Sequence, residues 1–132
     1  MNSADFQKGG FAADDSIIVA KMLESAGVDI IEISGGTYEQ PKLIGVDDLT
    51  INPERSEQRK ESTIAREAYF LEYAKDIRKA VSLPLMVTGG FRTKEGIEDA
   101  LQSNICQIIW IGRPLCADPY CVKKMIAGQL DI

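Results

Sequence analysis

Three short runs of apolar residues recur along the chain, and each is followed by a glycine-containing turn or by glycine itself. They cover residues 28–33 (VDIIEI), 83–88 (LPLMVT) and 105–111 (ICQIIWI). Because these runs are nearly continuous rather than alternating with polar residues, they predict parallel strands that are covered on both faces. Residues 1–4 resemble the end of one more strand. The pattern therefore predicts a parallel sheet.

Stretches with helical periodicity fill the gaps between these runs. A first helix is predicted to begin at the acidic pair Asp14–Asp15, and a second is capped by Ser62. A third begins after Thr93, and a fourth begins at Asp118–Pro119 and ends at Gly128. The apolar residues expected to face the sheet from the first three helices are Val19, Met22, Leu23 and Ala26, then Phe70, Tyr73, Ala74, Ile77 and Val81, then Ile97, Ala100 and Leu101.

Strand and helix alternate along the whole chain, which predicts an α/β fold with a parallel sheet. With the segment at residues 1–4, the chain holds about four β/α units, half of the eight in a closed barrel. We therefore predict a single domain over residues 1–132 that forms half of a (β/α)₈ TIM barrel; a small open parallel sheet is the alternative. Residues 37–61 have no periodicity, and we expect a long irregular loop there, either a solvated excursion or a substrate lid.

The composition narrows the range of functions. The net charge is −5 and the chain has no basic stripe, which argues against a nucleic-acid binder. It has no histidine, so Ser-His-Asp or Cys-His catalysis and a His-ligated metal are excluded. The cysteines at 106, 116 and 121 lack C-x-x-C spacing, so we expect buried or semi-buried free thiols and no metal site. With no signal peptide and no apolar run of membrane-spanning length, we expect a cytoplasmic protein.

Two glycine turns carry the clearest chemical signal. The segments 87–93 (VTGGFRT) and 111–114 (IGRP) each end a predicted strand and lead into a helix start. In barrels, the loops after strands seven and eight commonly form a phosphate site. Glycine lets the backbone approach an anion, amide N–H groups and the helix dipole favour it, and arginine adds a charged fork of donors. The two turns together predict a phosphate site that contains Gly89, Gly90, Arg92, Gly112 and Arg113.

Other residues near the strand ends have less decided roles. Ser34-Gly35-Gly36 ends a strand at the same edge but has no arginine beside it, which favours a plain turn. Glu32 lies within an apolar strand, where it either faces the barrel mouth as a functional group or pairs with a neighbouring lysine. Trp110 lies deep in the last strand, and we expect it in the core rather than as a platform on which a cofactor stacks.

The order of these motifs resembles the NADH:flavin oxidoreductase branch of the Old Yellow Enzyme family. The resemblance rests on the segments 2–6 (NSADF), 9–11 (GGF), 32–38 (EISGGTY), 66–70 (REAYF), 87–92 (VTGGFR) and 111–115 (IGRPL). It implies the C-terminal half of a full (β/α)₈ barrel that binds FMN at its mouth, with NADH or NADPH as the reductant. It also implies that the backbone at Gly89, Gly90, Gly112 and Arg113 holds the FMN phosphate, with Arg92 close by.

The same resemblance places the family's flavin-edge basic residue and substrate anchors in the N-terminal half. The catalytic residues of this chain therefore stay unassigned, and activity of the chain alone stays open. In the family, the position of Trp110 is small or aliphatic. As partner we expect a second copy of the chain or a separate N-terminal half-barrel. The alternatives are a non-catalytic half-barrel that self-associates, and a phosphate-ester-binding barrel enzyme of another class; the latter, as an aldolase, would need a strand lysine that is absent.

Overall fold

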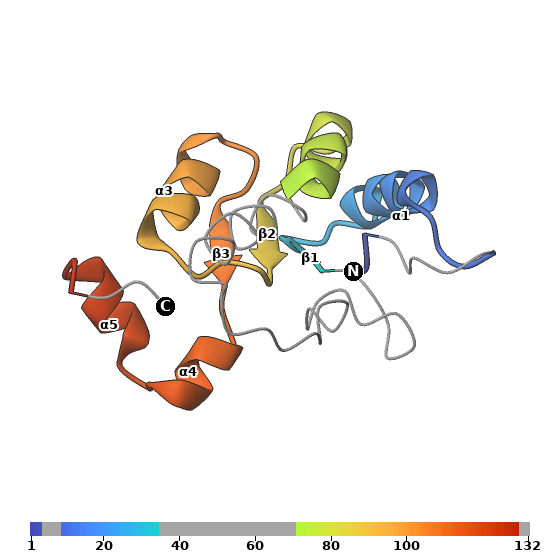
Figure 1. Ribbon diagram of the computed structural model, residues 1–132. Coiled ribbons are helices and arrows are strands. Elements are labelled where there is room, and N and C mark those ends of the chain that lie inside the picture. Colours follow the sequence, from blue (N-terminus) through green and yellow to red (C-terminus); the bar gives the residue numbers. More distant parts are fainter. Residues whose placement is uncertain (4–8, 35–70, 130–132) are drawn as a thin grey trace.

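The computed structural model describes residues 1–3, 9–34 and 71–129 (Figure 1). The predicted loop at 37–61, the predicted cap at Ser62 and the segment 66–70 lie outside the described residues. The described elements are, in chain order, α1 (Ala13–Ser25), β1 (Ile31–Ile33), a helix over residues 71–80, β2 (Leu85–Thr88), α3 (Lys94–Gln102), β3 (Ile108–Trp110), α4 (Arg113–Ala117) and α5 (Cys121–Ile126). The predicted α/β class is confirmed.

The described strands form one small, open, parallel sheet in the order β1-β2-β3. Ile33 lies opposite Val87, and Val87 lies opposite Ile109. Asn2 forms a parallel bridge with Ser34, as the predicted strand segment at the start of the chain requires. Each described strand lies beside its neighbour in sequence, without the reversal of strand order that marks a doubly wound sheet. In Figure 1, α1, the helix over 71–80 and α3 follow the same order along the sheet.

The strands are shorter than the apolar runs that predicted them. The run at 28–33 loses its first half to the end of α1, because the Val28 N–H donates to the Leu23 carbonyl (3.3 Å). Pro84 has no N–H to give to the sheet, and β2 begins one residue later. There the Leu85 N–H donates to the side-chain oxygen of Gln107 (2.9 Å), and the Gln107 N–H donates to the Leu85 carbonyl (2.9 Å). The partners of these backbone N–H and carbonyl groups, rather than hydropathy, set the strand ends.

The hydrophobic core lies against one face of the sheet. Its buried members are Ala20, Ile31, Ile33, Ala74, Ile77, Val81, Leu85, Val87, Phe91, Ala100 and Cys106. Every second residue of β1 and β2 is buried, so the residues between them face the opposite side of the sheet. The predicted inward faces of the second and third helices are confirmed at Ala74, Ile77, Val81 and Ala100.

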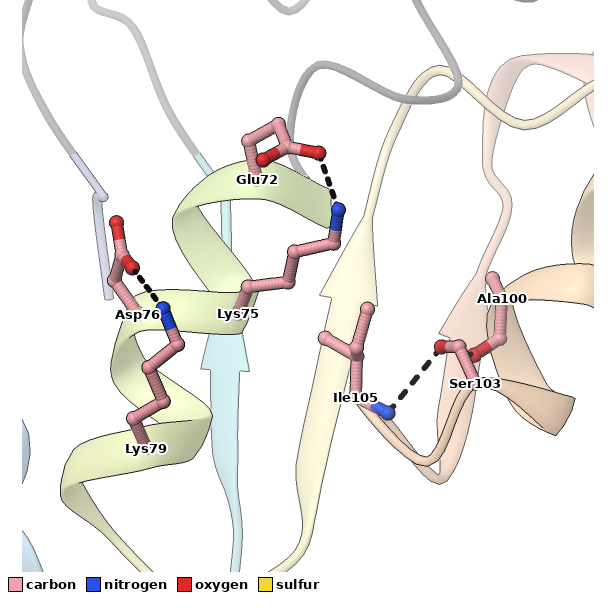
Figure 2. Close-up of polar contacts among 7 residues, drawn as sticks. All are labelled: Glu72, Lys75, Asp76, Lys79, Ala100, Ser103 and Ile105. Atoms are coloured by element: carbon pink, nitrogen blue, oxygen red, sulfur yellow. Dashed lines mark hydrogen bonds and ion pairs between the residues drawn. The ribbon is translucent and has the colours of Figure 1, made fainter.

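The solvent side of the helix over 71–80 carries ion pairs, and the end of α3 is closed by a serine (Figure 2). Lys75 pairs with Glu72, and Lys79 pairs with Asp76, in both cases three residues apart. The Ser103 hydroxyl donates to the Ala100 carbonyl (2.6 Å) and accepts from the N–H of Ile105 (3.3 Å). The Ser103 side chain thereby provides hydrogen-bond partners for a carbonyl at the end of α3 and for an N–H group that precedes β3.

The buried face of α1 differs from the predicted stripe, and that prediction was wrong at Met22, which is 64% exposed. The buried residues are Ser16 and Ala20. The Ser16 hydroxyl donates to the Ala13 carbonyl (2.6 Å), which satisfies a polar group inside the interface. Apolar side chains lie all around this helix, including the exposed Ile18. The spacing alone therefore fits more than one face.

The end of the chain also departs from the prediction. Residues 113–117 form the short helix α4, at the helix start predicted after the second glycine turn, and Pro114 near its beginning is typical of a first turn. The next helix, α5, begins at Cys121 rather than at Pro119. The cause is that a carboxylate oxygen of Asp118 accepts the N–H of Tyr120 (2.9 Å) and forms a turn before the helix.

All three cysteines are free. Cys106 and Cys121 are buried, as predicted, whereas Cys116 is exposed and that prediction was wrong. Burial raises the pKa of the Cys106 thiol. Among the residues that the structure describes, no helix has the length and apolar character to cross a membrane.

Candidate functional site

The two glycine turns meet at the carboxyl ends of β2 and β3. Thr88 ends β2 and Trp110 ends β3, and the two residues lie opposite each other in the sheet. The N–H of Gly89 donates to the Trp110 carbonyl (3.4 Å), after which the two loops continue around a common cavity. That cavity has a volume of about 410 Å³, and it is lined by all the predicted site residues: Gly89, Gly90, Arg92, Gly112 and Arg113.

The first loop owes its shape to its glycines and to an aromatic anchor. Gly89 and Gly90 have φ values of 95° and 88°, a region that residues with a side chain rarely adopt. Phe91 then turns back into the core and is fully buried, whereas Arg92 is exposed and lines the cavity. Thr93 caps α3 by accepting the N–H of Gly96 (3.1 Å). The loop is thus fixed at both ends.

The second loop uses its glycine differently. Gly112 has a φ of −118°, which other residues adopt readily. A Cβ atom placed at Gly112 would have no atom within 4 Å. The fold itself therefore does not require glycine here, and the space in front of the backbone is open toward the cavity. Arg113 follows directly as the first residue of α4 and is exposed.

The amide groups of the two loops differ in what they bind. Gly89 donates within the sheet, so it gives the loop its course rather than a free donor. Within residues 71–129, no hydrogen bond uses the N–H of Gly90 or of Gly112. Both residues line the cavity. Two backbone donors are therefore available to a ligand there, one from each loop.

A carboxylate also lines the cavity and has its charge balanced nearby. Asp118 forms an ion pair with Lys124 (Oδ2 to Nζ, 2.5 Å) and accepts the N–H of Tyr120 through Oδ1. Two hydrogen bonds lower the pKa of Asp118: the one from Lys124 has the larger effect, and the one from the Tyr120 backbone N–H has the smaller. Since Arg92 and Arg113 are also in the lining, the cavity suits an anionic ligand. From the sequence, Asp118 was predicted only to cap a helix. No sequence pattern indicated its ion pair with Lys124 or its place in the cavity lining.

Trp110 lies in the cavity wall, and the prediction that it belongs to the core was wrong. It is 50% exposed and it lines the cavity. In β3 the side chains of Ile108 and Trp110 share one face, and Ile109 packs against the core from the other. The continuous apolar run concealed this alternation.

Glu32 is half-buried in β1, on the sheet face opposite the core. Its carboxylate lies 3.4 Å from the amino group of Met1, not beside the predicted lysine, and it does not line the cavity. Gly35 and Gly36 lie outside the described residues. Among those that are described, no cluster of His, Cys, Asp and Glu side chains could hold a metal ion.

Known proteins resemble this chain in sequence and in fold. No protein-family model matches it. The NADH-dependent flavin oxidoreductase iliE of Neonectria sp. (strain DH2) is 35% identical over 129 residues, 96% of this chain and 16% of that protein. The iliE protein of Hypocrea jecorina (strain QM6a) is 38% identical over 114 residues, 85% of this chain and 26% of that protein. This chain is a relative of the NADH-dependent flavin oxidoreductases.

A solved structure agrees with that relationship. A 2-naphthoyl-CoA reductase in complex with 2-naphthoyl-CoA superposes with a TM-score of 0.74 and 26% identity, over 98% of this chain and 17% of the reductase. The family resemblance carried by the motifs is thereby confirmed. The chain spans only 16% of the length of the Neonectria iliE protein and 26% of the length of the Hypocrea iliE protein.

Proposed function

We propose that this chain is the FMN-phosphate-binding part of an oxidoreductase that takes hydride from NADH or NADPH. The observation that carries the proposal is the meeting of two glycine turns at one cavity, each with an amide donor that has no partner among the described residues. The names of the relatives support a flavin as the ligand. A phosphate group fits because two amides and two arginines belong to the lining, and its one carboxylate is paired with Lys124.

Each residue has a distinct part in holding the phosphate. The N–H groups of Gly90 and Gly112 donate to phosphate oxygens, and the Arg113 guanidinium supplies a charge-assisted bond. Arg92 adds positive charge at the same cavity. Gly89 directs the first loop through its positive φ. When bound, the flavin supplies hydride transfer, and these residues position it through its phosphate.

We also propose that the described sheet is the C-terminal half of a (β/α)₈ barrel. The parallel strands follow one another in sequence order, as they do in a barrel. The sheet face opposite the core is partly exposed, with Ile108 at 45% and Trp110 at 50%. In a closed barrel this face would line the interior. The remaining strands would come from a longer chain or from a second copy, and the exposed apolar face favours such association.

The experiment that tests the phosphate site is a titration of the wild type and Arg113→Ala with FMN, followed by quenching of flavin fluorescence. Loss of a charge-assisted hydrogen bond should weaken binding by about 1.5–3 kcal/mol, or about 10- to 150-fold. Lys79→Ala is the matched control, because it removes one positive charge from the solvent side of the helix over 71–80 (Figure 2). Equal affinities of wild type and Arg113→Ala would remove Arg113 from the site.

A further inference from the structure

The indole of Trp110 occupies a special position between the two phosphate-binding loops. Trp110 lies opposite Thr88, from which the chain runs into Gly89 and Gly90. Its own chain runs through Ile111 into the second loop. Its carbonyl accepts the N–H of Gly89, so the residue also links the two loops. Trp110 is 50% exposed and belongs to the cavity lining, in which it is the largest residue.

The sheet face that carries Trp110 also holds a polar group with no partner. The Thr88 hydroxyl oxygen is buried and forms no hydrogen bond among the described residues. Because parallel partners in register project to the same face, Thr88 and Trp110 lie on one side of the sheet. A buried hydroxyl without a partner is rare in a folded protein. The Trp110 indole on the same face is half-exposed.

We propose that Trp110 is a specificity-determining residue whose indole contacts the organic part of a bound phosphate monoester. This inference rests on the proposed phosphate site and extends it. The amides of Gly90 and Gly112 recognise the phosphate, and the indole offers a flat apolar surface with one N–H donor directly beside it. The cavity then discriminates between an ester and inorganic phosphate, because only an ester carries a group that covers the indole.

The test compares two ligands on three proteins: FMN and inorganic phosphate, each titrated into wild type, Trp110→Ala and Trp110→Phe by calorimetry and ³¹P NMR. Trp110→Ala should weaken FMN binding by about 10- to 50-fold, since the apolar contact is lost. It should leave the affinity for inorganic phosphate unchanged. Trp110→Phe should retain most of the FMN affinity, because a flat apolar ring remains. Tyr120→Ala is the control, an exposed aromatic residue outside the lining.

The outcomes separate this inference from the function on which it rests. If Trp110→Ala binds FMN as tightly as the wild type, or more tightly, the indole makes no favourable contact and the inference is overturned. A parallel loss of FMN and inorganic phosphate would also overturn it, since that result assigns Trp110 a role in loop structure alone. If the wild type binds neither ligand, the phosphate site itself fails, and this inference fails with it.

Discussion

Substituting Gly112 by alanine separates binding from folding at this site. Its φ of −118° is open to alanine, and the added Cβ would have no atom within 4 Å. The substitution therefore introduces no strain into the free protein. It should even stabilise the fold by about 0.4–1 kcal/mol, because alanine restricts the unfolded chain more than glycine does.

The effect on binding should have the opposite sign. The new methyl group projects into the open space in front of the backbone. In the proposed site, this is where a phosphate would approach the Gly112 N–H. A charge-assisted N–H···O contact of about 2.8 Å leaves no room for it, so at least one such bond is lost. That loss corresponds to about 1.5–3 kcal/mol, or an FMN affinity lower by about 10- to 150-fold.

The assay pairs urea denaturation with calorimetric titration of FMN for the wild type, Gly112→Ala and Gly90→Ala. At Gly90 the φ of 88° is unfavourable for alanine, so this variant should lose stability by about 1–2 kcal/mol as well as affinity. Only Gly112→Ala should become a weaker binder without becoming less stable. If Gly112→Ala binds FMN like the wild type, the backbone of the second loop does not contact the phosphate.

Other consequences of the structure can be measured on the same protein. Thr93→Ala should lower the free energy of unfolding by about 1 kcal/mol in urea, because the Gly96 N–H loses its cap, whereas Thr93→Ser should retain it; equal values for all three proteins would contradict this. Hydrogen bonds from Ser82 and Leu83 lower the pKa of Glu24, so its contribution is present above the ordinary carboxyl pKa of 4.5 and disappears as pH falls through the lowered value. The stability difference between wild type and Glu24→Gln should therefore shrink from pH 7 to pH 3, and a constant difference would refute the assignment. Light scattering at micromolar concentration should show a homodimer or larger species, and a clean monomer would count against association through the exposed sheet face. Stopped-flow oxidation of NADH by the FMN-loaded chain should be no faster than with free FMN, since a phosphate grip gives uniform binding; clear acceleration abolished by Arg113→Ala would reveal catalytic groups in this chain.

The sequence sufficed to predict that the two glycine turns lie together, because the determinants of that arrangement are local. Each loop is a short stretch in which glycine and arginine directly follow an apolar strand. Parallel strands place such loops at the same edge of a sheet, so Gly90 and Gly112 had to lie close together once the strands were identified. The helix over 71–80 was likewise predictable, since the buried Ala74, Ile77 and Val81 have one consistent helical spacing. In α3 only Ala100 is buried, and the predicted inward residue Leu101 is exposed.

The errors at Trp110 and Met22 arise where position depends on partners far away in the sequence. Hydropathy could not distinguish the two faces of β3, because Ile108, Ile109 and Trp110 are all apolar and only the packing of helices on one side separates them. The same ambiguity affected α1, where small residues rather than the large Met22 face the sheet. Hydrogen bonds between strands, such as that from Gln107 to Leu85, fixed the strand ends.

The most direct measurement of the central claim is an ¹H–¹⁵N NMR titration of the labelled chain with FMN and, separately, with riboflavin, which lacks the phosphate. If the two loops hold the phosphate, the amide signals of Gly90 and Gly112 should move downfield with FMN and stay in place with riboflavin. The Gly89 signal should move less, because its N–H already donates to Trp110. Equal shifts with both ligands, or no shift at Gly90 and Gly112, would contradict the account.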